Sequence, residues 1–390
     1  MALDIALCLF RYFPHGGAQR SCRQVALEAK ARGHQPVLFV AELRDAHPSE
    51  LGFPVVQLPV ARGSNHQRMA RFADQLLPQL GAFAAVVGFN KLPGLDVYYA
   101  ADPCLAWRLG RSFGPLLRGL PRYRRYLALE RAVFQPQGTS QIWALTPRAI
   151  AEYRAIYGRG GRQFHLLPPG LTPDRLPPED LDRQRRHWRS RWGVTDHTVI
   201  LCLGSSFYTK GLDRSLKAVA SLSRAQRCRT QLWVVGHDSP RQLQRHRRLA
   251  KGLGIASQVL FLGVRDDVPH LLRCADLLLH PARREVAGAA LLEAVINGLP
   301  VLASGCCGYG FHVKHANAGW VLTEPFSQES LNAALAACMA SPDQRFTWNQ
   351  NGLAYGRGQV WGQRAARAVD LLEEVGRGGR WGGARRGGGL

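Results

Sequence analysis

The sequence predicts an α/β protein with two Rossmann-like parallel-sheet domains facing across a cleft. Short apolar runs alternate with helical patterns along the chain, as they do in doubly wound parallel sheets. Residues 168–178 read PPGLTPDRLPP, and such a proline-rich stretch cannot continue a helix or a central strand. The alternation then starts again. Ligands of open α/β sheets bind at the carboxyl ends of the strands, so we expect the functional site there.

The first half of the chain contains five short apolar runs, each typical of a buried parallel strand. They are IALCLF (5–10), PVLFV (36–40), VVQL (55–58), AAVVG (84–88) and QIWAL (141–145). A helical pattern at residues 21–32 is closed by Gly33. The first run has no basic segment before it and no small-residue cleavage site after it. We therefore expect a strand there and not a signal peptide.

The second half repeats the alternation with six further apolar runs. They are TVILCLG (198–204), TQLWVVG (230–236), QVLFLG (258–263), DLLLH (276–280), PVLAS (300–304) and GWVL (319–322). Helices are expected at residues 213–222, 240–253, 289–297 and 363–375. The predicted domains are 1–170 and 171–358, then a helix within 359–375 that packs back on the first domain, and a disordered Gly/Arg tail at 376–390.

The composition limits the class of protein. Hydrophobic residues make up 46% of the 390 residues, which suits sizeable cores, and no apolar run is long enough to span a bilayer as a helix. Nine cysteines occur without a C-x-x-C pair, which favours a reducing cytosol over a disulfide framework or a zinc site. The net charge of +23 attracts polyanions such as nucleic acid, an anionic membrane or phosphorylated substrates.

The segment DLLLHPARREVAGAALLEAVINGLPVLAS (276–304) carries the strongest functional signal. A helix is expected to begin near 286–288, after the loop that follows the strand. The N–H groups of Ala287, Gly288 and Ala289 would then lie unpaired at its start and form an anion site suited to a diphosphate.

Two glutamates flank this expected anion site. Glu285 precedes the helix and Glu293 lies inside it, roughly 12 Å further along the axis. Carboxylates at that distance can hold the two hydroxyl-bearing rings of a sugar nucleotide on either side of its diphosphate. The alternative is an exposed loop Glu and a helix-surface Glu, but Glu293 lies in an apolar stretch, where a buried carboxylate needs partners.

Two further loops contain residues suited to phosphate. The loop GSSFYTKGLDRS (204–215) lacks the second glycine of a Walker A motif, but Lys210 in it can neutralise charge on a leaving diphosphate. A solvated loop lysine is the alternative. Gly16 and Gly17 follow the first strand and can bring backbone N–H groups near a phosphate. No G-x-G-x-x-G is present, which counts against a dinucleotide-dependent dehydrogenase.

Two features of residues 89–134 point to the site and to a surface. Asp102 follows an apolar segment that would deliver it to the cleft, or it caps a helix, since Asp before Pro often does so. Residues 105–134 contain seven Arg and one Glu among aromatic residues. This pattern fits a patch facing anionic lipid, but it also fits nucleic-acid binding or a solvated helix face with its aromatic residues in the core. The patch would include Arg118, Arg122, Arg124 and Arg125.

These residues together resemble the retaining glycosyltransferases of family 4, which have the GT-B fold. The resemblance rests on Glu285, Gly288 and Glu293 and on G-S-x-x-x-x-K-G at 204–211. Within that family the chain is similar to the lipopolysaccharide core glucosyltransferases over about residues 3–375. The similar stretches include YFPHGGAQR (12–20), VVGFNKLPGLDVYYAAD (86–102), LLPPG (166–170), DLLLHPA (276–282), CGY (307–309) and EPFSQE (324–329).

The resemblance implies transfer of α-glucose from UDP-glucose to a heptose of the lipopolysaccharide inner core, on the cytosolic face of the inner membrane. It implies an acceptor-side first domain, a nucleotide-sugar-binding second domain, and retention by front-face attack without a metal or other cofactor. The roles it implies are Glu285 at the hexose, Glu293 at the ribose, Lys210 at the diphosphate, Gly16 and Gly17 near the phosphate, Arg265 near the uracil, and Asp102 at the sugar or acceptor side. Residues 105–134 resemble the membrane-interacting region of the family.

One departure from the family and two rival functions remain open. The family usually has Arg-Lys where this chain has Thr209 and Lys210, so one cation is missing at the phosphate loop. UDP-galactose or a UDP-N-acetylhexosamine could replace UDP-glucose as donor. A basic nucleic-acid-binding protein is the rival from another class, but no RNA or DNA motif supports it, so we expect no nucleic-acid partner and a monomeric enzyme.

Overall fold

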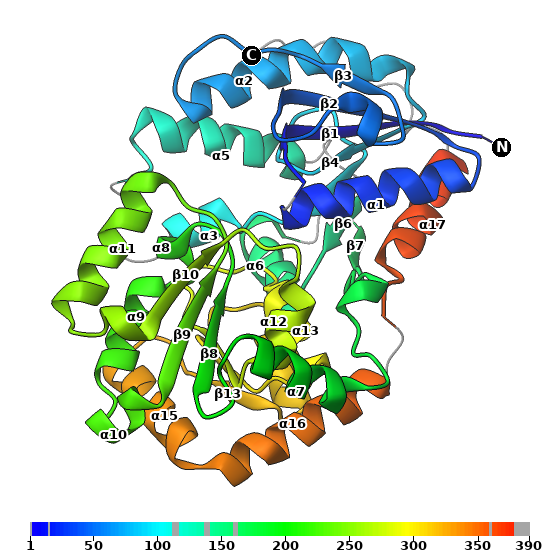
Figure 1. Ribbon diagram of the computed structural model, residues 1–390. Coiled ribbons are helices and arrows are strands. Elements are labelled where there is room, and N and C mark those ends of the chain that lie inside the picture. Colours follow the sequence, from blue (N-terminus) through cyan, green and yellow to red (C-terminus); the bar gives the residue numbers. More distant parts are fainter. Residues whose placement is uncertain are drawn as a thin grey trace. The chain divides into compact units, whose positions relative to one another are not determined.

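The computed structural model describes residues 2–14, 16–110, 117–135, 141–158, 163–358 and 361–377 and divides into two compact units. Unit 1 comprises Met1–Gly170 together with Gly362–Leu390, and unit 2 comprises Leu171–Trp361. Each unit contains one parallel β-sheet with helices packed on it (Figure 1), which confirms the predicted α/β class. Residues 378–390 of the expected Gly/Arg tail lie outside the described residues.

The sheet of unit 1 has seven parallel strands in the order β3-β2-β1-β4-β5-β6-β7. The strands are β1 (Asp4–Tyr12), β2 (Gln35–Leu43), β3 (Val55–Gln57), β4 (Ala85–Gly88), β5 (Val97–Ala100), β6 (Gln141–Ala144) and β7 (Gln163–Leu166). The sequence analysis named neither β5 nor β7 as a strand. β7 pairs only with β6 in the described sheet and exposes 49% of Leu166, so it lacks the continuous apolar character that identified the other strands.

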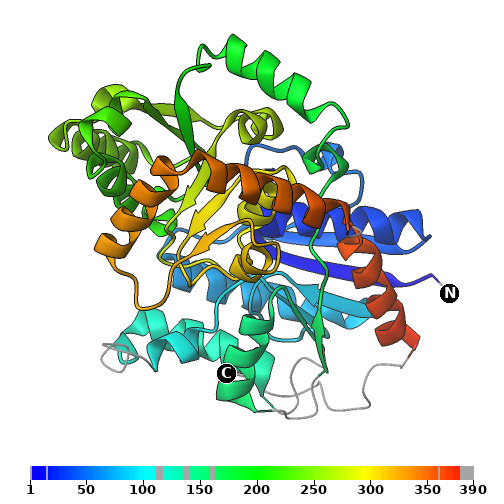
Figure 2. The ribbon, with the colours of Figure 1, turned by 90° about the horizontal axis from the view of Figure 1, so that it is seen from below.

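Six described α-helices belong to unit 1. They are α1 (Gly17–Ala31), α2 (Asn65–Leu76), α3 (Leu105–Leu109), α5 (Pro121–Phe134), α6 (Pro147–Tyr157) and α17 (Arg364–Arg377). The unit also has two short 3₁₀ segments, η1 (Pro48–Glu50) and η2 (Leu77–Ala82). Helix α17 lies beside α1 although the two are more than 300 residues apart in sequence (Figure 2). Arg364 holds the start of α17 against the rest of unit 1, since its guanidinium donates to the Pro168 carbonyl at 2.9 Å and to the Tyr99 hydroxyl at 3.2 Å.

The sheet of unit 2 has six parallel strands in the order β10-β9-β8-β11-β12-β13. They are β8 (Thr198–Leu203), β9 (Thr230–Val235), β10 (Val259–Gly263), β11 (Leu277–His280), β12 (Val301–Ala303) and β13 (Gly319–Val321), which confirms all six strands expected there. Side chains that alternate along each strand enter different cores. Val199, Leu201 and Trp233 lie in one core, and Ile200, Leu232 and Val234 lie in the other.

Ten α-helices surround this second sheet. They are α7 (Leu181–Arg191), α8 (Phe207–Lys210), α9 (Leu212–Ala220), α10 (Arg224–Cys228), α11 (Pro240–Gly252), α12 (Val268–Cys274), α13 (Ala289–Ile296), α14 (Gly310–His315), α15 (Gln328–Ala340) and α16 (Pro342–Arg357). Two further 3₁₀ segments are η3 (Pro173–Arg175) and η4 (Ala256–Gln258). Helices α12, α13 and α14 contribute to the first core, and α9, α11 and α15 to the second.

The strand order places the switch point of each sheet. Successive strands are added toward one edge of the sheet and then toward the other. The order switches between β1 and β4 in unit 1, and between β8 and β11 in unit 2. Ligands of such sheets bind beyond the carboxyl ends of the strands at that point. In unit 2, the chain leaves β8 toward Lys210 and leaves β11 toward Glu285, so the fold brings these two loops to the same place.

Candidate active site

Lys210 lies at the end of a short helix formed by the loop after β8. Helix α8 ends at Lys210, Gly211 turns the chain with φ +78°, and α9 begins at Leu212. The sequence analysis placed Lys210 in a loop ahead of a single helix and did not predict α8. A Cβ atom at Gly211 would lie 2.0 Å from the Pro281 carbonyl oxygen, so a glycine is required for this turn to pack against the loop after β11.

Glu285 lies in the loop between β11 and α13, and neighbouring backbone holds this loop in place. The Gly308 N–H donates to the Glu285 carbonyl at 3.2 Å, and the Tyr309 N–H donates to the Ala287 carbonyl at 2.6 Å. Gly288, with φ +88°, caps α13. The loop therefore leads directly into the start of the helix, as expected.

Helix α13 begins where the expected helix 289–297 does, which is slightly later than the start near 286–288 expected for the anion site. Its first residue is Ala289, so Ala287 precedes the helix and only Gly288 and Ala289 of the three predicted amides lie at its start. The first amides of a helix have no carbonyl partner within it, and they carry the positive end of the helix dipole. The start of α13 thus keeps the properties of an anion site next to Glu285.

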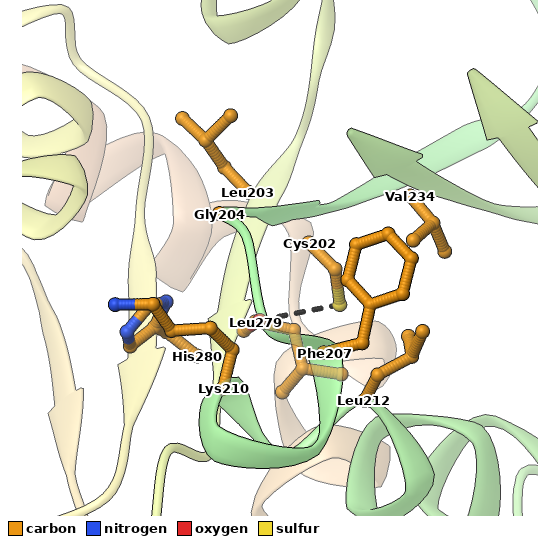
Figure 3. A pocket seen from close by; sticks show the side chains of 9 residues that line it. All are labelled: Cys202, Leu203, Gly204, Phe207, Lys210, Leu212, Val234, Leu279 and His280. Atoms are coloured by element: carbon orange, nitrogen blue, oxygen red, sulfur yellow. Dashed lines mark hydrogen bonds between the residues drawn. The ribbon is translucent and has the colours of Figure 1, made fainter. Parts of the chain in front are cut away.

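The structure brings Lys210, Glu285 and His280 together. The Lys210 ammonium forms an ion pair with Glu285 Oε2, and His280 Nε2 lies 3.1 Å from the same oxygen. Figure 3 shows the ends of Lys210 and His280 close together at a pocket of about 10 Å³ that Cys202, Phe207 and Leu279 also line. The sequence analysis did not identify His280 as a site residue, although it named this residue as the end of a strand.

These contacts determine the charge of Glu285. Its side chain is only 13% exposed, and burial by itself would raise the pKa of the carboxyl. The His280 hydrogen bond and the Lys210 ammonium outweigh burial and lower the pKa to about 2. Glu285 is therefore a fixed carboxylate at neutral pH, suited to accept hydrogen bonds from hydroxyl groups and unsuited to donate a proton.

Glu293 lies inside α13 as predicted and is 5% exposed. Its partner is Arg175, whose Nη1 lies 3.3 Å from Glu293 Oε2. The Asn297 side-chain amide donates to the Arg175 carbonyl at 2.7 Å and holds the arginine backbone against α13. Arg175 belongs to the proline-rich stretch that the sequence analysis treated only as a linker.

Arg265 follows β10 and pairs with a neighbouring carboxylate. Its guanidinium donates to both Asp267 oxygens, at 2.8 and 2.6 Å, and lies 5.6 Å from the Trp192 ring. The structure thus joins Lys210 to Glu285, whereas Glu293 and Arg265 each have a different partner.

In unit 1, Gly16 and Gly17 lie where β1 passes into α1. Gly16 is the N-cap of α1 and Gly17 its first residue. A Cβ atom at Gly16 would lie 1.9 Å from Gln19 Oε1, whereas one at Gly17 would meet open space. A side chain at Gly16 would thus displace the Gln19 side chain, whereas Gly17 leaves the start of α1 open.

Asp102 is half-buried beyond β5, and its backbone carbonyl accepts a hydrogen bond from the Tyr153 hydroxyl at 2.9 Å. Burial raises the pKa of its carboxyl, and this effect is only partly offset by Lys91 and by a hydrogen bond from Asn90. The interpretation of Asp102 as a helix cap is wrong. Helix α3 begins at Leu105, and the carboxylate of Glu130 accepts its first amides.

Glu130 is the single acidic residue of the basic segment, and it is fully buried. It accepts hydrogen bonds from the N–H groups of Leu105 and Ala106 at 2.7 and 2.9 Å and from the Tyr157 hydroxyl at 2.8 Å. Lys91 lies 2.5 Å away and forms an ion pair with it. Glu130 of α5 therefore links the loop between β4 and β5 with helices α3 and α6. The sequence analysis did not predict this role.

Most of the described arginines of the basic segment are exposed to solvent. Arg118, Arg122, Arg124 and Arg125 are exposed, and all but Arg122 line an open hollow of about 600 Å³ on α5 together with Arg131. Among the aromatic residues of the segment, Tyr123 borders this face, with its ring centroid 5.8 Å from the Arg122 guanidinium. Phe134 is buried, Trp107 packs against the core, the Tyr126 ring lies 6.3 Å from that of His66, and Phe113 lies outside the described residues. The exposed surface is thus mainly cationic.

Two further kinds of feature, a metal-ligand cluster and a membrane-spanning helix, are not found among the described residues. Within the described ranges, no group of three or more His, Cys, Asp or Glu side chains is arranged to hold a metal ion. No helix of the described part of the chain is both long and apolar enough to cross a membrane.

The fold and the loop that carries Glu285 agree with a known class of enzyme. Residues 184–354 match the model of the family described as Glycosyl transferases group 1. The structures of Anabaena Alr3699/HepE in complex with UDP and glucose have the same fold, with a TM-score of 0.74 and 17% identity over 95% of this chain and 100% of that chain. Two parallel-sheet units with this site define a glycosyltransferase of the GT-B type.

One relative is similar over nearly its whole length. The lipopolysaccharide glucosyltransferase WaaG of Escherichia coli strain K12 is 40% identical over 371 residues, which cover 94% of this chain and 98% of WaaG. The crystal structure of WaaG, a glycosyltransferase involved in lipopolysaccharide biosynthesis, matches with a TM-score of 0.88 over 94% of this chain and 99% of that one. The chain therefore belongs to the WaaG family of group 1 glycosyltransferases, which confirms the predicted family and fold.

Proposed function

We propose that this enzyme transfers glucose from UDP-glucose, with retention of configuration, to a heptose of the lipopolysaccharide inner core. The observation that carries the proposal is the cluster of Lys210, Glu285 and His280 beside the start of α13, in a chain 40% identical to WaaG. The glucose donor and the core acceptor come from that relationship and from the resemblance of the site motifs.

The donor is assigned to unit 2. Glu285 is an ionised carboxylate that accepts hydrogen bonds from the hexose hydroxyls, and Glu293 accepts them from the ribose. The amides at the start of α13 and the Lys210 ammonium hold the diphosphate between them. Arg265 contacts the uracil. Gly16 and Gly17 of unit 1 approach the phosphate, since an open N-terminal turn admits an anion.

The proposed reaction breaks the bond between the anomeric carbon and the diphosphate oxygen. The acceptor hydroxyl attacks from the face that UDP leaves, and its proton passes to the departing diphosphate oxygen. Lys210 and the α13 amides stabilise the negative charge on that oxygen, which makes a divalent cation unnecessary. Asp102 of unit 1 is assigned to the sugar or acceptor side, where its raised pKa favours hydrogen bonding over strong basicity.

The acceptor is lipid-linked, so we propose that the enzyme works as a peripheral protein on the cytosolic face of the inner membrane. The exposed arginines of α5 supply a cationic surface for anionic headgroups. Replacing Arg122, Arg124 and Arg125 together with Gln should weaken binding to vesicles that contain phosphatidylglycerol and leave binding to neutral vesicles unchanged. Equal binding of both proteins to the anionic vesicles would contradict this assignment.

A panel of nucleotide sugars tests the donor. UDP-glucose, UDP-galactose and UDP-N-acetylglucosamine would be offered with a core lipopolysaccharide truncated after the heptoses, with and without EDTA. We expect transfer from UDP-glucose at an unchanged rate in EDTA, and an α-linkage in the product by NMR. Transfer from another donor only, or loss of activity in EDTA that Mg²⁺ restores, would contradict the donor or the metal-independent mechanism.

A substitution of Glu285 tests the site. Glu285→Ala should reduce kcat by at least about a hundredfold, the usual effect of removing a charge that acts in the transition state. Glu179→Ala is the matched control, because Glu179 is an exposed carboxylate of the same unit. Both variants should give cooperative thermal unfolding. Normal turnover by Glu285→Ala would show that the site is wrongly assigned.

A further inference from the structure

Helix α11 in unit 2 presents a cationic face that the proposed reaction does not use. The helix contains four arginines and one lysine that are all exposed, and it contains no acidic residue. They are Arg241, Arg245, Arg247, Arg248 and Lys251. At 100° per residue, Arg241, Arg245 and Arg248 form one row along the helix, and Arg247 and Lys251 both lie to one side of it.

No acidic side chain of the described residues forms an ion pair with any of these five cations. By contrast, Arg185 and Arg189 of the basic helix α7 both pair with Asp276, and Arg183 pairs with Asp180. Arg247 lies over the Phe261 ring at 5.5 Å, which leaves its charge uncompensated. The α11 face therefore carries a local excess of positive charge.

The opposite side of α11 is anchored next to the catalytic loop. His246 and Ala250 are buried, and the His246 ring packs edge-on against Phe207 with ring centroids 6.0 Å apart. Asp238, two residues ahead of the helix, accepts a hydrogen bond from the Phe207 N–H at 2.7 Å. Phe207 begins α8, the helix that ends at Lys210. The helix that would contact an anion layer on its exposed side thus packs on its other side against the element that carries Lys210.

We propose that the exposed face of α11 is a second membrane-binding surface, which contacts the phosphates of anionic lipids. The inference rests on the proposed function, in which the acceptor is lipid-linked. A straight row of cations suits a planar layer of phosphates. The exposed face has no aromatic side chain on which bases could stack, so single-stranded nucleic acid fits it less well.

The test compares two triple variants that lose the same charge from the same unit. Arg241, Arg245 and Arg248 are replaced with Gln in one full-length protein, and Arg183, Arg186 and Arg191 of α7 in the other, since these three are also exposed. Binding is measured by co-sedimentation with vesicles of phosphatidylcholine and phosphatidylglycerol at 0.1 M and 0.5 M NaCl. Thermal unfolding of each variant checks the fold.

Each cation near an anionic bilayer contributes about fivefold to partitioning. The α11 variant should therefore bind at least tenfold more weakly at 0.1 M NaCl, with little difference at 0.5 M, and the α7 variant should bind as the wild type does. Unchanged binding by the α11 variant would overturn the proposal. Equal losses in both variants would overturn it too, because net charge would then be the cause. If the α11 variant lost binding to a single-stranded RNA, measured in parallel, but kept binding to vesicles, the face would be assigned to nucleic acid instead.

Two further measurements separate this inference from the proposed function. Transfer from UDP-glucose to a lipid-free core oligosaccharide, measured without vesicles, should be the same in the α11 variant and the wild type. If the wild type itself fails to transfer, the proposed function is wrong, whereas the vesicle comparison still decides the role of α11. Reduced transfer to the lipid-free acceptor by the α11 variant would contradict a purely membrane-binding role.

Discussion

Lys210 and Glu285 form an ion pair between the loop after β8 and the loop after β11. The sequence analysis assigned the two residues to different parts of a donor, the diphosphate and the hexose. Their contact means that each is held by the other before any ligand arrives, with His280 as a third member. If the proposed donor binds here, it exchanges this internal ion pair for contacts with phosphate and sugar hydroxyls.

The first prediction concerns the pH dependence of stability. The pKa of Glu285 is lowered to about 2, whereas an unfolded Glu titrates near ~4.3. Such a carboxyl stabilises the fold above the unfolded pKa, and this stabilisation is lost as the pH falls toward 2. Glu285→Gln should thus lower stability by on the order of 3 kcal/mol at pH 7 and by progressively less below pH 4.

Thermal unfolding of the wild type and Glu285→Gln between pH 3 and 7 measures this effect. Glu179→Gln is the control, since this exposed carboxylate has no ion-pair partner in the described part of the chain. A difference between wild type and Glu285→Gln that stays constant over the whole pH range would count against an ionised Glu285.

The second prediction concerns Arg175 and Glu293. Arg175→Met keeps an apolar stem of similar length but leaves the 5% exposed Glu293 without its cation. Breaking a buried pair in this way costs about 3 kcal/mol, or roughly 5–10 °C in Tm for a unit of this size. Because Glu293 is assigned to the ribose, KM for UDP-glucose should rise more than kcat falls.

The double variant Arg175→Met with Glu293→Gln separates the two effects. Removing the unpaired charge should restore most of the lost stability but leave KM high. Arg175→Lys should be close to wild type in both measurements. If Arg175→Met were as stable as the wild type, the pair would not hold Glu293.

The third prediction concerns Glu130, which is fully buried among four donors. Glu130→Gln removes the charge opposite Lys91 and turns an amide NH₂ toward backbone N–H groups. It should destabilise unit 1 by about 3 kcal/mol or more. Tyr157→Phe removes one of the hydrogen bonds and should cost about 1 kcal/mol. Equal and small losses in urea unfolding of the two variants would exclude Glu130 as the centre of this cluster.

The sequence was sufficient for eleven of the thirteen described strands and for the placement of Glu285 before α13 and Glu293 within it, because their signals are local. Runs such as TVILCLG at 198–204 are continuously apolar over a strand length, and the spacing of Glu285 and Glu293 follows from one loop and one helix. The expected helix at 289–297 begins where α13 does, but the anion site was placed one to three residues too early, since Gly288 fixes the cap through a positive φ that the letters alone do not determine.

The missed residues depend on contacts between distant parts of the chain. Glu130 meets Lys91 across 39 residues and Tyr157 across 27, so its position among seven arginines gave no sign of burial. Arg175 reaches Glu293 across 118 residues from a stretch whose prolines pointed only to a linker. A single apolar or charged pattern cannot identify such partners, because the tertiary fold creates them.

The last prediction concerns the cation missing at Thr209. The neighbouring Arg283 cannot replace it. Its N–H donates to the Thr209 carbonyl at 2.8 Å, but its guanidinium is bound to both Asp213 oxygens at 2.7 and 2.8 Å and lies over the Tyr208 ring. Its charge is thus compensated by Asp213, as that of Lys210 is by Glu285, and Lys210 is the cation that we assign to the diphosphate.

Thr209→Arg should therefore strengthen donor binding. A half-exposed cation beside a phosphate adds up to about 1 kcal/mol, so KM for UDP-glucose should fall by about threefold, and more at low salt. Thr209→Gln extends the side chain without charge and should leave KM unchanged. Steady-state kinetics at 0.05 M and 0.3 M NaCl compare the three proteins. A KM that does not fall in Thr209→Arg, or that falls equally in Thr209→Gln, would mean that Thr209 does not face the diphosphate.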